Sequence, residues 1–240
     1  MMNPSGTLAG GMVVTESCRY ALYYTAPPGS GLARFGCGVL GYDTATGAPV
    51  PRHDGFADAQ DVTRAPSRYG FHATLKAPMR LAPGVAEADL VAAAAALAAW
   101  HPPVPVGRLV VATLGAFTAL VPDEAPPALG LFAAECVAAL DPLRAPLSEA
   151  ERARRRPERL DARERALLDR WGYPHVFERF RFHMTLTDAL PEEDRAPWHA
   201  RLAAAYGPGE PLTLDAVTVL RQDGDAPFRV LRRIPLGDPA

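Results

Sequence analysis

A nine-residue pattern occurs twice in this chain of 240 residues, and it constrains the fold more than any other feature. Residues 68–76 read RYGFHATLK, and residues 179–187 read RFRFHMTLT. The copies can be aligned on His72 and His183, which are 111 residues apart. Arginine, an aromatic residue, phenylalanine, histidine, threonine and leucine then match. Both copies have the residue types of a β-strand, so the sequence predicts two similar units with a histidine strand in each.

Side chains alternate between the two faces of a strand, and the two copies divide cleanly on that basis. One face is apolar and predicts contact with a core: Tyr69, Phe71, Ala73 and Leu75 in the first copy, and Phe180, Phe182, Met184 and Leu186 in the second. The opposite face carries Arg68, Gly70, His72, Thr74 and Lys76 in the first copy, and Arg179, Arg181, His183, Thr185 and Thr187 in the second. Because these polar faces contain cations and donors but no carboxylate, they indicate a binding site for an anion.

Composition and charge restrict the function classes. The net charge of −2 gives no overall electrostatic reason to bind DNA, RNA or an anionic membrane. Cys18, Cys37 and Cys136 lack metal-ligand spacing, and an odd number of cysteines without a secretory signal is typical of free thiols. No apolar run is long enough to cross a bilayer. We therefore expect a soluble, cytoplasmic protein without a membrane partner; its oligomeric state is not encoded in any pattern that we recognise.

The pattern along the chain predicts a disordered tail over residues 1–16 and one bilobal α+β domain over residues 17–240. Besides the histidine strands, it predicts strands at about 18–25, 104–121, 212–221 and 228–235, helices at about 30–40, 87–100, 126–140 and 192–206, two capped helices between 149 and 171, and a long loop over 41–66. Each histidine strand is followed by a helix and then by strand material. Residues 66–121 and 172–236 are therefore expected to be two repeat units, whose histidine strands face each other across a central groove.

These paired His-x-Thr-Leu strands resemble those of the two-histidine (2H) phosphoesterase superfamily, which includes RNA ligase-like proteins and 2′,3′-cyclic nucleotide phosphodiesterases. More closely, the chain is similar to the branch encoded in bacterial phosphonate-utilisation operons, through residues 19–24, 68–76, 172–174 and 180–187. The resemblance implies an α+β, bilobal 2H phosphoesterase-like fold. It consists of two pseudo-twofold-related antiparallel sheet lobes with outer helices and a central groove. It also implies phosphodiester chemistry on a small or nucleotide-like substrate.

The chemistry can also be argued from the residues. Hydrolysis of a cyclic phosphodiester needs a base for the attacking water and an acid for the departing alkoxide, and imidazole serves in either role near neutral pH. His72 and His183 are the candidate acid and base, in either assignment, and Thr74 and Thr185 are candidate donors to the phosphate oxygens. The candidate phosphate-binding residues are Lys76, which is the single lysine of the chain, Arg68, Arg181 and Tyr173. This chemistry requires no metal and no cofactor.

Several alternatives stay open at this point. The enzyme could instead process RNA ends or 2′,5′-linked RNA, and the arginine-rich segment at 149–165 could contact RNA, although its interleaved glutamates are typical of a solvated face. A non-catalytic protein that binds a phosphate ligand would keep the same anion site without turnover. A metallohydrolase is disfavoured because neither histidine face carries an Asp or Glu ligand. Among small substrates, the ribose cyclic phosphate formed during phosphonate breakdown is a candidate, on the operon association alone.

Overall fold

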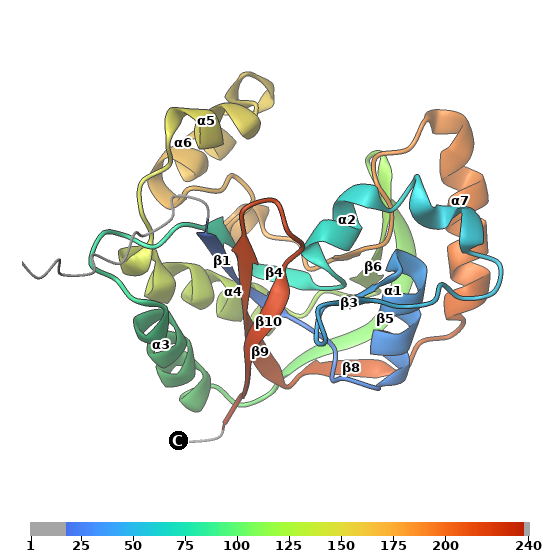
Figure 1. Ribbon diagram of the computed structural model, residues 1–240, viewed down its shortest axis with the longest axis horizontal. Coiled ribbons are helices and arrows are strands. Elements are labelled where there is room, and N and C mark those ends of the chain that lie inside the picture. The colour runs from blue at the N-terminus through green and yellow to red at the C-terminus, as the bar shows by residue number, and fades with distance from the viewer. Residues whose placement is uncertain (1–17, 238–240) are drawn as a thin grey trace, which may run out of the picture.

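The computed structural model describes residues 18–237, so the expected tail at 1–16 lies outside the described residues. Within that range the chain forms an α+β fold around one curled antiparallel sheet of eight strands, in the order β10-β9-β1-β4-β7-β6-β5-β8 (Figure 1). The strands are β1 (Cys18–Tyr24), β4 (Ala73–Met79), β5 (Val104–Leu114), β6 (Phe117–Pro122), β7 (Met184–Thr185), β8 (Pro211–Leu214), β9 (Ala216–Asp223) and β10 (Arg229–Pro235). A separate small sheet pairs β2 (Tyr42–Asp43) with β3 (Ala48–Pro49).

The helices form two groups, one at either side of the sheet. Figure 1 shows α3, α4, α5 and α6 on the left and α1, α2 and α7 on the right. Their bounds are α1 (Gly31–Leu40), α2 (Arg64–Tyr69), α3 (Glu87–Ala99), α4 (Pro127–Leu140), α5 (Glu149–Arg154), α6 (Ala162–Trp171) and α7 (Glu192–Tyr206). Short 3₁₀ turns cover Ala57–Gln60, Asp141–Leu143, Pro157–Arg159 and Phe177–Arg179. No helix within residues 18–237 combines the length and apolarity that a membrane crossing requires.

Local signals account for the helix ends. Ser148 and Asp161 cap α5 and α6, and in each helix a glutamate three residues later, Glu151 or Glu164, returns a hydrogen bond to the backbone of the capping residue. Helix α6 ends at Gly172, whose φ of 75° is the left-handed conformation that glycine adopts without strain. The sequence therefore predicted this helical pair, which lies above the sheet in Figure 1.

The two histidine strands pair with each other at the centre of the sheet. Strand β4 runs antiparallel to β7, and Ala73 lies opposite Met184. These are equivalent positions of the two sequence copies, so the pair is symmetric about a local twofold axis. Outside this pair, each half of the sheet takes strands from both predicted repeat units. Strands β5 and β6, which follow the first histidine, lie on the β7 side, whereas β9 and β10 lie on the β4 side.

One face of this central pair packs into the core. Phe71, Ala73, Phe182 and Met184 are buried, and they belong to the main hydrophobic cluster together with side chains of α1, α3, α4 and α7. Burial of this apolar stripe fixes the strand register, because a slip by one residue would turn every core side chain toward the opposite face. The expected alternation is therefore present around both histidines, and side chains of α1, α3, α4 and α7 pack against the apolar face.

The strand prediction for residues 68–72 was wrong, as was the loop prediction for the whole of residues 41–66. Residues 64–69 form α2, and Gly70, with a φ of 74°, reverses the chain before the strand begins at Ala73. A side chain cannot replace the hydrogen of Gly70, since a Cβ there would lie 1.8 Å from Oγ1 of Thr44. The second copy is strand only at Met184–Thr185, after a 3₁₀ turn.

Candidate functional site

The antiparallel register places both histidine motifs around one cavity. With Ala73 opposite Met184, His72 comes opposite Thr185 and Thr74 comes opposite His183. These four side chains are partly exposed and line a cavity of about 490 Å³, called here the histidine cavity. A neighbouring cavity of about 570 Å³ shares Thr74 and His183 with it. Two imidazoles and two hydroxyls from distant parts of the sequence therefore face the same space.

Each histidine is held by a backbone carbonyl two residues before it. Nδ1 of His72 lies 2.8 Å from the oxygen of Gly70, and Nδ1 of His183 lies 2.8 Å from the oxygen of Arg181. A carbonyl oxygen can only accept, so both Nδ1 atoms carry the proton, which leaves Nε2 as the free acceptor of each neutral ring. Nε2 of His72 lies 3.2 Å from Oγ1 of Thr74. The carbonyl two residues before each histidine thus fixes the tautomer of the imidazole.

Aromatic rings from the flanking strands support both imidazoles. Tyr23 of β1 stacks on His72, with ring centroids 3.7 Å apart and an angle of 16° between the planes. Phe117 of β6 lies beside His183, with centroids 5.7 Å apart and planes tilted by 51°. Sequence analysis missed both rings as site residues. Only the structure reveals the role of Tyr23, because it pairs Tyr23 with Thr74 and cross-strand partners share a face.

Burial keeps both histidines neutral in the unliganded protein. Burial, with a smaller contribution from repulsion by a protonated His183, lowers the pKa of His72 to about 4, against the opposing hydrogen bond to the Gly70 carbonyl. Burial also lowers the pKa of His183, against the hydrogen bond to the carbonyl of Arg181. Desolvation penalises the charged form of an imidazole, so each ring is a base at neutral pH. An anion bound between the rings would favour protonation of one of them.

The prediction that Lys76 binds phosphate in the groove is contradicted by its position. Its side chain is only 4% exposed, and Nζ lies 3.1 Å from Oδ1 of Asp141 and 3.0 Å from the carbonyl oxygen of Val137. A β-bulge is the cause: Tyr23 lies opposite Thr74, but the preceding residue, Leu22, lies opposite Lys76. The extra residue in β4 breaks the alternation and turns Lys76 to the core side, where Leu22 is buried.

Thr187, at the equivalent position of the second copy, is buried in the same way. The backbone N–H groups of Leu186 and Thr187 both donate to the carbonyl oxygen of Thr118, at 2.9 and 3.2 Å, so two residues again oppose one. Oγ1 of Thr187 accepts from the N–H of Thr118 and donates to the carbonyl of Asp188. The expected polar rows therefore end at the threonines, two residues after each histidine.

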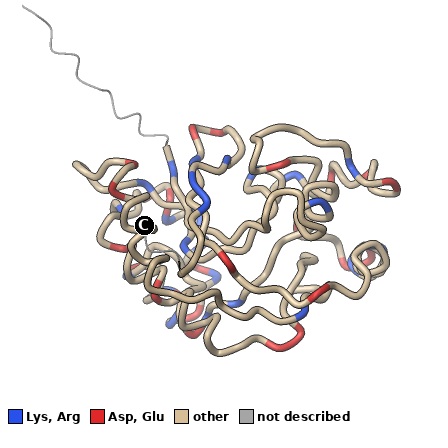
Figure 2. Tube along the Cα trace, turned by 90° about the horizontal axis from the view of Figure 1, so that it is seen from below, with Lys and Arg blue, Asp and Glu red and all other residues tan. Residues whose placement is uncertain are grey.

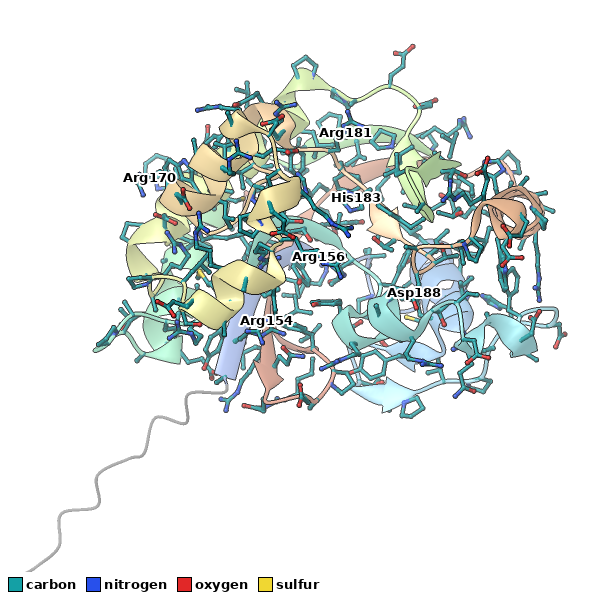
Figure 3. The ribbon with its side chains drawn as sticks, turned by 90° about the horizontal axis from the view of Figure 1, so that it is seen from above. Arg154, Arg156, Arg170, Arg181, His183 and Asp188 are labelled. Atoms are coloured by element: carbon teal, nitrogen blue, oxygen red, sulfur yellow. The ribbon has the colours of Figure 1, made fainter. Side chains whose placement is uncertain are left out.

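Of the other predicted phosphate ligands, Arg68 does not line either cavity. It belongs to α2 rather than to a strand, and its guanidinium donates to Asp225 at 3.1 Å. Arg181 is exposed and lines the neighbouring cavity beside His183, and its guanidinium has no hydrogen-bonding or ion-pair partner within residues 18–237 (Figure 3). Tyr173 lines both cavities. The structure therefore brings Arg181 and Tyr173 to cavities that the histidines line, and it does not bring Arg68 there.

Three arginines at the histidine cavity were not predicted as site residues. Arg154 and Arg155, at the end of α5, line the cavity, and so does Arg19 of β1. The guanidinium of Arg155 lies over the ring of Tyr173, 4.9 Å from its centroid. The glutamates interleaved with the arginines of residues 149–165 indicated a solvated face. No pattern in the neighbouring residues indicated that the end of α5 lies at the histidine cavity.

Positive and negative residues elsewhere alternate along the chain. Figure 2 shows Lys and Arg interspersed with Asp and Glu over the trace, without a large segment of a single sign. Within the described part of the chain, no three side chains of the types His, Cys, Asp and Glu are grouped so that they could hold a metal ion. The described cysteines are free thiols, and Cys136 is buried. The histidine cavity and the neighbouring cavity thus both bring cationic and titratable groups together, and they share His183.

Comparison with known proteins gives two curated relatives, both named ribose 1,5-bisphosphate phosphokinase PhnN. The protein of Janthinobacterium sp. (strain Marseille) is 41% identical over 229 residues, which is 90% of this chain and 50% of that protein. The protein of Laribacter hongkongensis (strain HLHK9) is 38% identical over 224 residues, which is 90% of this chain and 51% of that protein. The chain therefore spans about half the length of these relatives and matches their N-terminal part.

Two solved structures are also similar to this chain. Escherichia coli LigT, crystallised with 3′-AMP, is 15% identical with a TM-score of 0.41, covering 93% of this chain and 100% of that one. A conserved protein of unknown function from Agrobacterium tumefaciens strain C58 is 12% identical with a TM-score of 0.43, covering 92% of this chain and 87% of that one. The family model named DUF1045, a protein of unknown function, matches residues 74–229. Because that match covers more than half of its length, the chain belongs to the DUF1045 family.

Proposed function

We propose that this protein is a metal-independent phosphodiesterase of the 2H phosphoesterase type, which hydrolyses a small cyclic phosphodiester. In this proposal the two halves of the sheet are pseudo-twofold-related lobes, and the catalytic pair lies at their junction. The single observation that carries the proposal is the pairing of β4 with β7, which puts His72 and His183 on one cavity, each with Nδ1 bound to a carbonyl. Two such bases on either side of one space suit in-line displacement at phosphorus.

The proposed reaction uses both imidazoles. One Nε2 accepts a proton from water while the water oxygen forms a bond to phosphorus. The bond from phosphorus to the ring oxygen breaks, and that oxygen takes the proton carried by Nε2 of the second imidazole. The product is a phosphomonoester with a free hydroxyl, and one proton has moved from one histidine to the other. The hydroxyls of Thr74 and Thr185 donate to the two non-bridging oxygens, where charge develops.

The depressed histidine pKa values fit this scheme when the substrate is an anion. In the unliganded cavity both rings are neutral at pH 7, so the acid must gain its proton as the phosphodiester binds. A bound negative charge raises the pKa of a neighbouring imidazole, because it favours the protonated form. The guanidinium of Arg181 pairs with no carboxylate among residues 18–237, and it supplies a further positive charge beside His183 in the neighbouring cavity.

The names of the relatives favour a sugar substrate. A hydrolase that opens a cyclic phosphate on ribose produces a ribose phosphomonoester, and the relatives are named for phosphorylation of a ribose bisphosphate. A protein that joins such a hydrolase to such a kinase would carry out consecutive reactions on one sugar. We do not assign the kinase activity of these relatives to this chain. In a P-loop the lysine directly follows a glycine, whereas the single lysine of this chain, Lys76, follows Leu75. We therefore propose a role in phosphonate metabolism, with a ribose cyclic phosphate as substrate.

Hydrolysis assays test the proposal directly. A panel of ribose cyclic phosphates and 2′,3′-cyclic nucleotides, followed by ³¹P NMR, should show ring opening that persists in EDTA and falls by about 10²–10⁴-fold in His72→Ala and in His183→Ala. The matched control is His199→Ala, because His199 lines neither cavity and its ring hydrogen-bonds the carbonyl of Val111, away from the proposed site. Full activity of both catalytic variants would refute the proposal, and loss of turnover in EDTA would refute its metal independence.

A further inference from the structure

The histidine cavity carries more positive charge than one phosphodiester needs. Arg19, Arg154 and Arg155 line it, and none of them pairs with a carboxylate within residues 18–237. Glu151 is the carboxylate on its wall, and it is already bound to Arg80 by two hydrogen bonds of 3.0 and 2.9 Å. The hydrogen bond from Arg80 lowers the pKa of Glu151 to about 2, so that carboxylate stays ionised and stays with Arg80.

The two arginines of α5 are placed for an incoming ligand. The Arg154 side chain is exposed and has no partner among the described residues, and it lines the same cavity as His183. Arg155 is half-buried and rests on Tyr173, which also lines the cavity. A guanidinium stacked on an aromatic face is oriented while its N–H donors remain available. Helix α5 thus brings two guanidinium groups to the wall of the cavity.

Arg19 adds a third guanidinium on β1. Its Nε donates to Oε1 of Gln222 at 2.9 Å, so its partner is neutral and its charge is uncompensated. It lies on the same face of β1 as Tyr23, four residues along the strand, which corresponds to about 13 Å between the two Cα atoms. Tyr23 stacks on His72. Arg19 is therefore offset along the strand from the reacting centre, where a distal part of the substrate would lie.

We propose that Arg154 and Arg155, together with Arg19 of β1, bind a second phosphate of the substrate. The substrate class is then a cyclic phosphodiester of a sugar that also carries a phosphomonoester. The charges agree: a diester carries one negative charge and a phosphomonoester about −1.5 to −2 at pH 7, which together balance three guanidinium groups. This inference rests on the proposed function, and it specifies the substrate by a group far from the reacting bond.

A matched pair of probes tests the second phosphate. The wild-type protein should hydrolyse α-D-ribose 1,2-cyclic phosphate that carries a 5-phosphate with a kcat/KM about 10²-fold higher than the same compound without it, because charge-assisted hydrogen bonds to arginine are strong. In the Arg154→Ala/Arg155→Ala double variant this ratio should fall below about fivefold. In Arg154→Lys/Arg155→Lys, which keeps the charges but loses the guanidinium geometry, the ratio should be intermediate.

A charge-matched control separates a specific contact from the general field of the protein. Arg232 is exposed, has no partner among residues 18–237 and lines neither cavity, so Arg232→Ala should leave the ratio unchanged. Circular dichroism and thermal melting of every variant show whether the fold is intact. Equal kcat/KM for both probes in the wild-type protein, or a ratio that survives in the folded double alanine variant, would overturn the inference.

Direct binding keeps the inference testable if neither probe is hydrolysed, an outcome that would count against the proposed function alone. Calorimetry with the phosphorylated probe and His183→Ala protein should then give a Kd at least about tenfold lower than with the unphosphorylated probe, and the α5 double variant should abolish that difference. A dinucleotide that ends in a 2′,3′-cyclic phosphate serves as a third probe. If it is hydrolysed faster than the phosphorylated sugar, the arginines bind the adjacent phosphate of an RNA, and the sugar assignment is wrong.

Discussion

The buried ion pair between Lys76 and Asp141 offers a test of the structure that is independent of any assigned function. We predict that Asp141→Asn lowers the free energy of unfolding by about 3–5 kcal/mol, which is the usual cost of removing one partner of a buried pair. The Lys76 side chain is 4% exposed and that of Asp141 is 10% exposed. Asp141 also pairs with Arg144 at 2.9 Å and with Arg170 at 3.0 Å, so the substitution leaves three cations without a counter-charge.

The cost has an upper bound, because the lysine can lose its proton instead. Deprotonation at pH 7 of an amine whose unfolded pKa is about 10.4 costs about 4.6 kcal/mol. Burial already lowers the pKa of Lys76, against the charge of Asp141, and Asp141→Asn would lower it further. The unfolded chain then binds more protons than the folded one between the two pKa values, so the stability of the variant rises with pH across that window. From pH 7 to pH 9 the deficit should shrink by up to about 2.7 kcal/mol.

Urea denaturation followed by circular dichroism measures these quantities, and thermal melting should show a decrease in Tm of about 6–20 °C. Asp61→Asn is the matched control, since Asp61 pairs with Arg64 at 2.9 Å and both side chains are at least 75% exposed. That substitution should cost less than about 1 kcal/mol. A deficit below 1 kcal/mol for Asp141→Asn would show that Lys76 is not buried against this carboxylate, and it would restore Lys76 as a candidate phosphate ligand.

Three further predictions follow from the site geometry. Because burial lowers the pKa of both His72 and His183, kcat/KM should peak below pH 6.5 and fall about tenfold per pH unit on the alkaline side, whereas an optimum above pH 8 would contradict the neutral-ring interpretation. Tyr23→Leu should lower kcat/KM by about 2–10-fold through loss of the stacked ring, while Tyr23→Phe should retain activity; equal rates for both variants would exclude a positioning role. Gly70→Ala should destabilise the fold by at least about 2 kcal/mol in urea, because of its positive φ and the contact with Thr44, and wild-type stability would refute the reversed backbone.

Local pattern was sufficient to predict most of the helices and strands and the pair of histidine motifs. The alternation around His72 and His183, the capping residues of α5 and α6, and the glycine after α6 are properties of short segments, and the structure has each of them. Such features depend on neighbours within a few residues, so they can be recognised without knowledge of the fold. The histidine and threonine of each copy accordingly lie on one face, as the sequence predicted.

The bulges, the strand order and the charge pairing were decided only by the tertiary structure. Lys76 meets Asp141, 65 residues away, and Arg68 meets Asp225, 157 residues away, so no local signal distinguishes them from free cations. One extra residue in β4 was enough to move the only lysine from the groove to the core. The arginines of α5 reach the histidine cavity because a separate helical pair lies over the sheet. Side-chain type and periodicity specify which groups a strand can present, but long-range packing determines which charges remain unpaired and therefore available to a ligand.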